Sequence, residues 1–169
     1  MPNLNNRLAK HGVFRSDNMM GTKIGSHLVT LRYDEDIDNG HVLVIGDLEP
    51  DSREARIASI PAVNTPLNQL AICGSEEIVK DVPTHDIFEF YNIAGTLIRA
   101  YRFASHDIFS ISRMCLSDDS LDPEVGQVAT ISNGTRIRVS NTETGTVIGR
   151  VIEVELESTG HEFVVIQVN

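Results

Sequence analysis

The chain has 169 residues, a hydrophobic content of 41% and a formal net charge of −10 at pH 7. These values predict a soluble globular protein with one core-bearing domain, or such a domain preceded by an arm. The sequence holds no run of about 18 apolar residues, which argues against a membrane partner, and its acidity argues against a nucleic-acid partner. The polar N-terminus shows no signal sequence, so Cys73 and Cys115 are expected to be free core residues.

Charge is divided unevenly along the chain. Residues 1–33 carry five basic residues and one acidic residue, whereas residues 34–169 carry nine basic and 23 acidic residues, so the net charges are +4 and −14. Apolar residues are also sparse before residue 34. We therefore predict a basic, extended N-terminal arm over 1–33 and an acidic β-rich body over 34–169. The arm residues expected to bind a partner are its cations and its last apolar side chains: Arg7, Lys10, Arg15, Lys23, Leu28, Leu31 and Tyr33.

Short segments rich in β-branched residues recur after residue 40, with turn signals at intervals of roughly 8–12 residues. The expected strands lie in HVLVIGDL, REARIASI, QLAIC, TLIRAYRF, DIFSISRMCL, QVATIS, TRIRVS, TGTVIGRVIEVELE and HEFVVIQV. Asn133-Gly134 predicts a hairpin with a type I′ turn. Because no segment of helical length is periodic, we predict an all-β fold with little helix. This fold would be an antiparallel β-barrel or sandwich preceded by the extended arm.

The stretch DEDIDNGH (34–41) places three aspartates on alternate positions before a glycine, as a calcium loop does. Counting from Asp34 puts Asn39 at position 6, where the loop needs glycine, and Ile45 at position 12, where it needs glutamate. The EF-hand pattern therefore fails, and we predict neither a metal nor any other cofactor, although weak cation binding by the carboxylates stays open. We interpret residues 38–40, Asp-Asn-Gly, as a turn that leads into the first clear strand.

The tetrapeptide HDIF occurs at 85–88 and again at 106–109. A histidine beside an aspartate serves catalysis only with a nucleophile in reach, and neither copy follows a nucleophile-elbow motif. We expect a turn role in which the aspartate turns the chain and the isoleucine and phenylalanine enter the core. Arg136, Arg138 and Arg150 could form a cationic patch, but we expect them to pair with carboxylates. The sequence thus predicts no catalytic residues and no enzymatic activity.

Three long stretches resemble a known family. They read NNRLAKHG…GSHLVTLRYDEDIDNGHVLVIGDLE, QLAICGSEEIVKDVPTHDIFEFYNIAGTLIRAYRFASHDIFSIS and GTVIGRVIEVELESTGHEFVVIQV. Together they resemble the accessory head proteins of tailed bacteriophages, the decoration or cement proteins that coat the major capsid shell. The resemblance covers most of the chain from about residue 21 and consists of ordinary strand and turn residues, without a catalytic signature.

The resemblance implies a non-enzymatic virion protein, made in the host cytoplasm, that binds the assembled major capsid protein at the capsid surface and stabilises the head. It also implies a homo-oligomer, with a trimer as one option. The arm would then dock on neighbouring subunits by adding a strand. Two alternatives stay open. One is another virion component, such as a head-fibre base or a tail-associated β-module, and the other is a β-barrel that binds or hydrolyses a small molecule.

Overall fold

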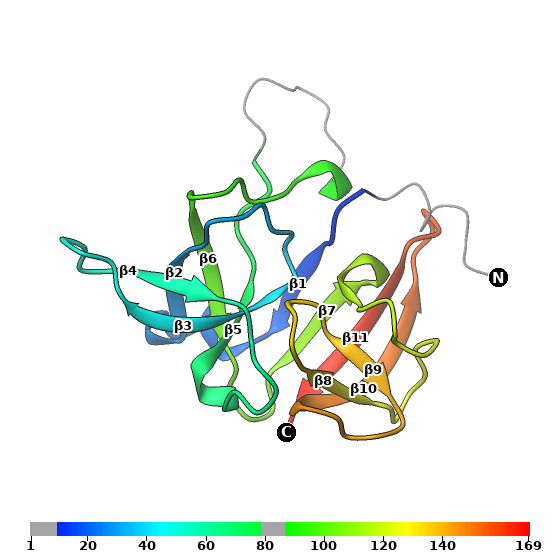
Figure 1. Cartoon of the computed structure of the whole chain (residues 1–169). Coiled ribbons are helices and arrows are strands. Elements are labelled where there is room, and N and C mark those ends of the chain that lie inside the picture. The colour runs from blue at the N-terminus through cyan, green and yellow to red at the C-terminus, as the bar shows by residue number, and fades with distance from the viewer. Residues whose placement is uncertain (1–9, 79–86) are drawn as a thin grey trace.

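The computed structural model describes residues 10–78 and 87–169, which form a closed β-barrel and an open β-sheet (Figure 1). Strands make up 43% of the structure, and the predicted all-β fold is confirmed. In place of α-helices, the described parts of the chain contain 3-10 turns: Met20–Thr22 (η1), Gly25–His27 (η2), Leu67–Gln69 (η3), Ile87–Glu89 (η4) and Arg113–Cys115 (η5). Within those parts, no helix has the length and apolar character needed to cross a membrane.

Five strands close the barrel in the order β2-β4-β3-β5-β6. Their bounds are Leu28–Arg32 (β2), Val42–Leu48 (β3), Ala55–Ser59 (β4), Leu70–Cys73 (β5) and Leu97–Arg102 (β6). The strand β2 closes the wall, because it pairs parallel with β4 and antiparallel with β6. Successive side chains of a strand point to opposite faces, so alternate residues fill the barrel. They include Val29, Leu31, Leu43, Ala58, Ala71, Ile98 and Ala100.

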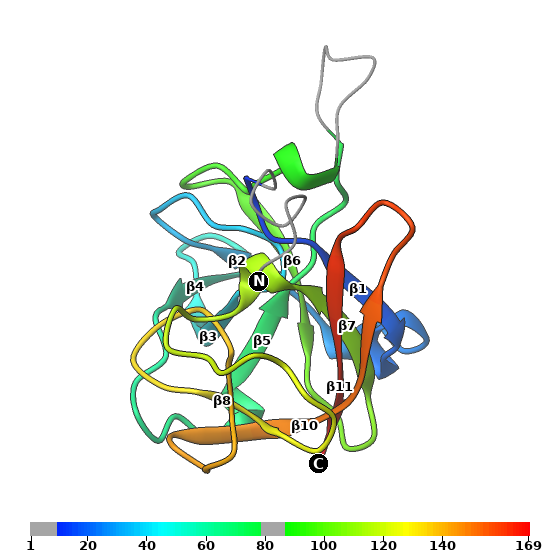
Figure 2. The ribbon, with the colours of Figure 1, turned by 90° about the vertical axis from the view of Figure 1, so that its right-hand side faces the viewer.

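Six antiparallel strands form the open sheet in the order β1-β7-β11-β10-β8-β9 (Figure 2). Their bounds are Phe14–Asn18 (β1), Ile108–Ser112 (β7), Val128–Ile131 (β8), Arg138–Ser140 (β9), Thr146–Leu156 (β10) and Glu162–Val168 (β11). The longest strand, β10, pairs with β11 along one edge and with β8 along the other, and its register shifts on both edges.

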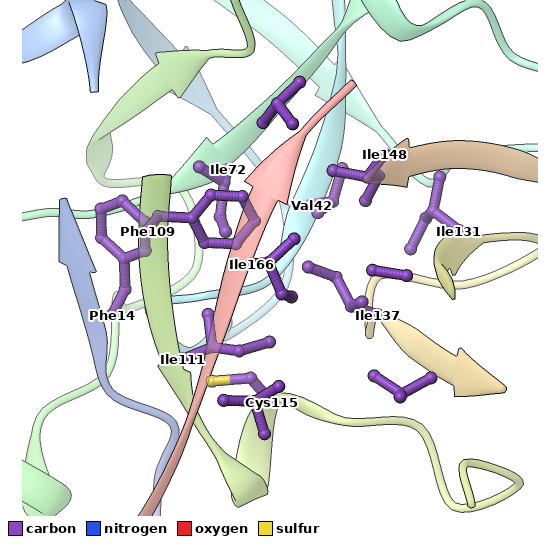
Figure 3. Close-up of a cluster of buried hydrophobic side chains, with 14 of the residues drawn as sticks. Phe14, Val42, Ile72, Phe109, Ile111, Cys115, Ile131, Ile137, Ile148 and Ile166 are labelled. Carbon is purple, nitrogen blue, oxygen red and sulfur yellow. The ribbon is translucent and has the colours of Figure 1, made fainter. Parts of the chain in front are cut away.

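The larger hydrophobic core lies between the barrel and the open sheet. Val42 of β3 and Ile72 of β5 point outward from the barrel and pack in one cluster with Phe109 and Ile166 of the sheet, as Figure 3 shows. All four side chains are fully buried. Because the barrel interior and this second cluster use opposite faces of β3 and β5, both faces of these strands are apolar. The barrel and the sheet therefore pack as one body.

The N-terminal segment contributes one strand to the open sheet and one to the barrel. The sequence had instead predicted an extended arm over residues 1–33. Residue Phe14 of β1 pairs with Ile111 of β7, and β2 completes the barrel wall. The chain thus begins in the open sheet, passes through the barrel and returns to the sheet, and no boundary falls at residue 33. Each of these two strands has only five residues, and main-chain hydrogen bonds to distant partners hold them. A composition shift could not reveal such partners.

The hairpin predicted around Asn133-Gly134 is present, but its turn differs from the predicted type. Strands β8 and β9 form the expected hairpin, with Thr130 opposite Arg138. The turn type was wrong, because a type I′ turn needs positive φ at both central residues, and only Asn133 (φ 48°) has it, whereas Gly134 does not. The six residues between the two strands form a longer loop instead.

Candidate interaction surface

The cations predicted to bind a partner are paired within the molecule. Lys10 Nζ lies 3.2 Å from Glu89 Oε1, and Lys23 Nζ donates to Asn18 Oδ1 at 2.8 Å. The guanidinium of Arg15 pairs with Glu157 and lies over the Phe163 ring, 3.9 Å from its centroid. The predicted contact residue Arg7 lies outside the described residues. The ion pairs of Lys10 and Arg15 attach the N-terminal segment to the rest of the molecule, whereas the hydrogen bond of Lys23 stays within the segment.

The apolar anchors predicted for the arm are largely buried. Leu31 is fully buried inside the barrel, and Tyr33 is 8% exposed. Burial is also the main reason that the pKa of the Tyr33 phenol is raised, with the neighbouring Glu35 carboxylate adding to the effect. Leu28 is half-buried at the start of β2. Alternation in β2 directs Leu31 into the barrel, and Tyr33, which follows the strand, is also buried, so neither side chain is exposed in the way that the predicted partner contact requires.

The acidic stretch 34–41 stabilises the backbone around it. The carboxylate of Asp38 accepts hydrogen bonds from the Gly12 amide at 2.8 Å and lies 2.7 Å from His11 Nδ1. Asn39 is buried and exchanges two side-chain hydrogen bonds with the main chain of Ser75, at 2.9 and 3.0 Å. No group of three metal-ligating side chains occurs within residues 10–78 and 87–169. The turn interpretation of this stretch agrees with these contacts and with the positive φ of Gly40, 83°.

The second HDIF copy marks a strand entry as expected. The Asp107 carboxylate accepts hydrogen bonds from the Ala104 amide at 2.9 Å and the Met20 amide at 2.7 Å, and Phe109 enters the core. His106 lies at a shallow hollow of about 480 Å³ whose lining includes Arg150. Among the described residues, that lining contains no serine, cysteine or carboxylate side chain. The first copy differs: His85 and Asp86 lie outside the described residues, and the residues that follow form η4 rather than a strand.

The potentially reactive side chains are held in unreactive forms by burial. Cys73 and Cys115 are free and fully buried, and burial raises the pKa of both thiols to about 12. His41 is 8% exposed, and its Nδ1 lies 3.1 Å from Thr135 Oγ1. Burial lowers the pKa of His41 to about 4, because the charged imidazolium loses its hydration there. These groups therefore contribute to the core, as expected for the cysteines.

Two of the three C-terminal arginines line a polar cavity of about 630 Å³ beside the β8–β9 hairpin. Within it Arg136 pairs with Asp118 at 3.3 Å and Arg138 pairs with Asp119 at 2.9 Å. The third, Arg150, lies 3.9 Å from Glu143. The expectation that these arginines pair with carboxylates is confirmed, so they do not form an open cationic patch.

The outer wall of the barrel instead exposes two large apolar side chains, Ile57 of β4 and Leu97 of β6, which we call the apolar row. Their exposed fractions are 49% and 56%. Arg32 of β2 stands between them, because it is in register with both. Arg32 is itself fixed by an ion pair with Glu49 at 2.8 Å. Exposed apolar side chains grouped on one face are typical of protein-binding surfaces.

Sequence reasoning missed this row. Its members lie in two segments, β4 and β6, that only the closing of the barrel brings together, and the alternation in TLIRAYRF does not reveal which face is exposed. No protein-family profile, curated protein or solved structure matches the chain. The function is therefore inferred from the surface of the molecule and from the resemblance of its sequence.

Proposed function

We propose that the protein is a non-enzymatic virion component, a decoration protein that binds the assembled major capsid protein of a tailed bacteriophage and stabilises the shell. The resemblance of its sequence to accessory head proteins supports the class. The apolar row supports binding of a partner protein, and it is the observation that carries the proposal. A homo-oligomer on the capsid surface is part of the same proposal.

The surface of the molecule fits a capsid-binding protein better than it fits an enzyme that acts on a small molecule. Apolar side chains fill the barrel interior, which leaves the outer wall as the place where a partner can bind. Burial keeps both thiols protonated at neutral pH and lowers the pKa of His41 to about 4, so the thiols are poor nucleophiles and His41 is a weak, buried base. A rigid two-sheet body with an apolar outer wall suits a protein that covers another surface.

Co-sedimentation with capsids that lack the protein tests this proposal. Wild-type protein is expected to pellet with the capsids. Leu97→Glu places a charge in the apolar row, and its capsid-bound fraction is expected to fall at least about tenfold, because desolvating a carboxylate is costly. Leu121→Glu is the matched control, since Leu121 is 46% exposed but lies in the acidic loop away from the row.

Two results would contradict the proposal. Wild-type protein that stays in the supernatant with capsids at micromolar concentration would rule out capsid binding. Equal binding by Leu97→Glu and wild type would show that the apolar row is not the contact surface. Electron microscopy of decorated particles then locates the protein, and density on the tail or on a head fibre would favour the other virion roles.

A further inference from the structure

We propose that a groove lined by β4, β2 and β6 of the barrel binds an acidic segment of a partner protein. The groove has a volume of about 410 Å³ and is lined by Arg56 of β4, by Leu28 and Thr30 of β2, and by Arg99 and Arg102 of β6. Among the described residues, Glu54 is the single carboxylate in its lining. The groove therefore carries a local net charge of +2 on a molecule whose overall charge is −10.

Two of the three arginines of this groove, Arg56 and Arg102, differ from the third, Arg99, which pairs with Glu76 at 2.9 Å. Seven of the ten described arginines form an ion pair with a carboxylate. Three do not: Arg53, Arg56 and Arg102 have no carboxylate oxygen within 4 Å among the described residues. Two of these three line the groove, and Arg53 lies in the adjacent β3–β4 connection. Carboxylates outnumber cations in this chain by 24 to 14, so unpaired arginines gathered in one place point to an external anion.

The geometry of the groove favours a polypeptide as the source of that anion. Thr30 is in register with Arg99 on one side and with Ala55, the neighbour of Arg56, on the other. Adjacent strands are about 4.8 Å apart, so the arginines of β4 and β6 lie on strands about 10 Å apart. Carboxylates on alternate residues of an extended segment are about 6.8 Å apart, and such a segment can reach both sides. Leu28 adds an apolar contact that an inorganic anion cannot use.

Charge and position support the same occupant. A nucleic acid would meet the acidic surface of the rest of the molecule, which disfavours its approach. The groove also adjoins the apolar row, because Thr30 lies two residues before Arg32 on the same face of β2. The exposed apolar side chains of β4 and β6 and the arginines of the groove thus belong to the same three strands. A partner that binds both would present an apolar patch next to an acidic segment.

Fluorescence anisotropy of the full chain with a labelled ten-residue glutamate peptide tests the groove. This readout needs no capsid, so it can fail or succeed independently of the decoration role. We expect saturable binding in 20 mM salt that weakens as salt is raised. The double variant Arg56→Gln/Arg102→Gln is expected to weaken binding about tenfold. Arg150→Gln, remote from the groove, is the matched control and is expected to leave binding unchanged.

The Arg56 guanidinium also donates a hydrogen bond to the Gly46 carbonyl oxygen at 3.1 Å, so replacing Arg56 could weaken the fold as well as the groove. A second variant that leaves this hydrogen bond intact is therefore needed. Glu54→Gln removes the Glu54 carboxylate from the lining and is expected to tighten peptide binding about threefold. The proposal is overturned if the peptide does not bind, if Glu54→Gln leaves its affinity unchanged, or if a thymidine oligonucleotide binds as tightly. It is also overturned if equimolar inorganic phosphate displaces the peptide, since the site would then recognise a small anion.

Discussion

His41 shows how one side chain of the acidic stretch is fixed by its surroundings. It follows Gly40, whose positive φ lets the chain turn into β3, and a Cβ on Gly40 would lie 2.5 Å from Cys115 Sγ. The imidazole is therefore carried into the interior, where Thr135 is its hydrogen-bond partner. Burial lowers its pKa, nearby Arg136 lowers it further, and only Asp38 raises it. The folded protein thus holds a neutral histidine at pH values where the unfolded chain binds a proton.

This difference predicts a dependence of stability on pH. Between the unfolded pKa of 6.5 and the folded pKa of about 4, the unfolded state binds more protons, so the free energy of unfolding falls as the pH is lowered through this window. Between pH 7 and pH 5 the loss from His41 is about 2 kcal/mol. Urea unfolding at both pH values measures it. His41→Asn, which keeps a partner for Thr135, should lose about 2 kcal/mol less over this range.

The comparison isolates the contribution of His41, because the rest of the chain is the same in both proteins. Wild type and His41→Asn with the same change in stability between pH 7 and pH 5 would show that His41 is not held neutral. The variant is expected to be less stable than wild type at pH 7, because asparagine fills the site less well, and that offset does not affect the comparison of slopes.

At the scale of elements, β10 is the strand that tolerates least change. It lies between β8 and β11, and Gly149 is opposite Val168 on one side and Ala129 on the other. A Cβ built on Gly149 would lie 1.9 Å from the Gln167 carbonyl oxygen, which is part of the backbone and cannot rotate away. The register shift between Val147 and Gly149 lies beside this close approach. The glycine therefore sets how closely β10 and β11 pack.

Gly149→Ala is expected to destabilise the fold by at least about 3 kcal/mol, because the two central strands must separate to admit the methyl group. For a chain of this length that loss lowers Tm by about 10 °C, which thermal unfolding followed by circular dichroism will show. Gly25→Ala is the control, since nothing lies within 4 Å of a Cβ there. A Tm for Gly149→Ala within about 2 °C of the control would mean that the strands adjust at little cost.

The strands show what the sequence could predict and what it could not. The strands from β3 onward lie within segments expected from alternation and turn residues, because each carries its own apolar or β-branched pattern. The role of residues 14–32 was missed, since β1 and β2 depend on partners far along the chain, β7 for the first and both β4 and β6 for the second. The apolar row and the cationic groove were missed for the same reason. Both combine side chains that are adjacent only across strands.

At the scale of the whole molecule, the N-terminal segment closes the structure. Figure 1 shows β1 at the edge of the open sheet and β2 within the barrel, so residues 14–32 span both halves. Without β2 the barrel loses its parallel strand, and β4 and β6 each gain a free edge. The interior also loses Val29 and Leu31. Free strand edges beside an opened apolar core favour aggregation.

Truncation therefore tests whether residues 10–33 are a separable arm or an integral part of the fold. A fragment of residues 34–169 is expected to lose cooperative urea unfolding, to bind a hydrophobic dye and to aggregate, because it lacks two strands and part of the barrel core. A fragment of residues 10–169 keeps every strand and is expected to unfold with the midpoint and slope of the full chain. If the shorter fragment unfolds cooperatively with the stability of the full chain, residues 10–33 are a separable arm after all. If it behaves as expected, capsid binding must be tested by point substitutions in the apolar row.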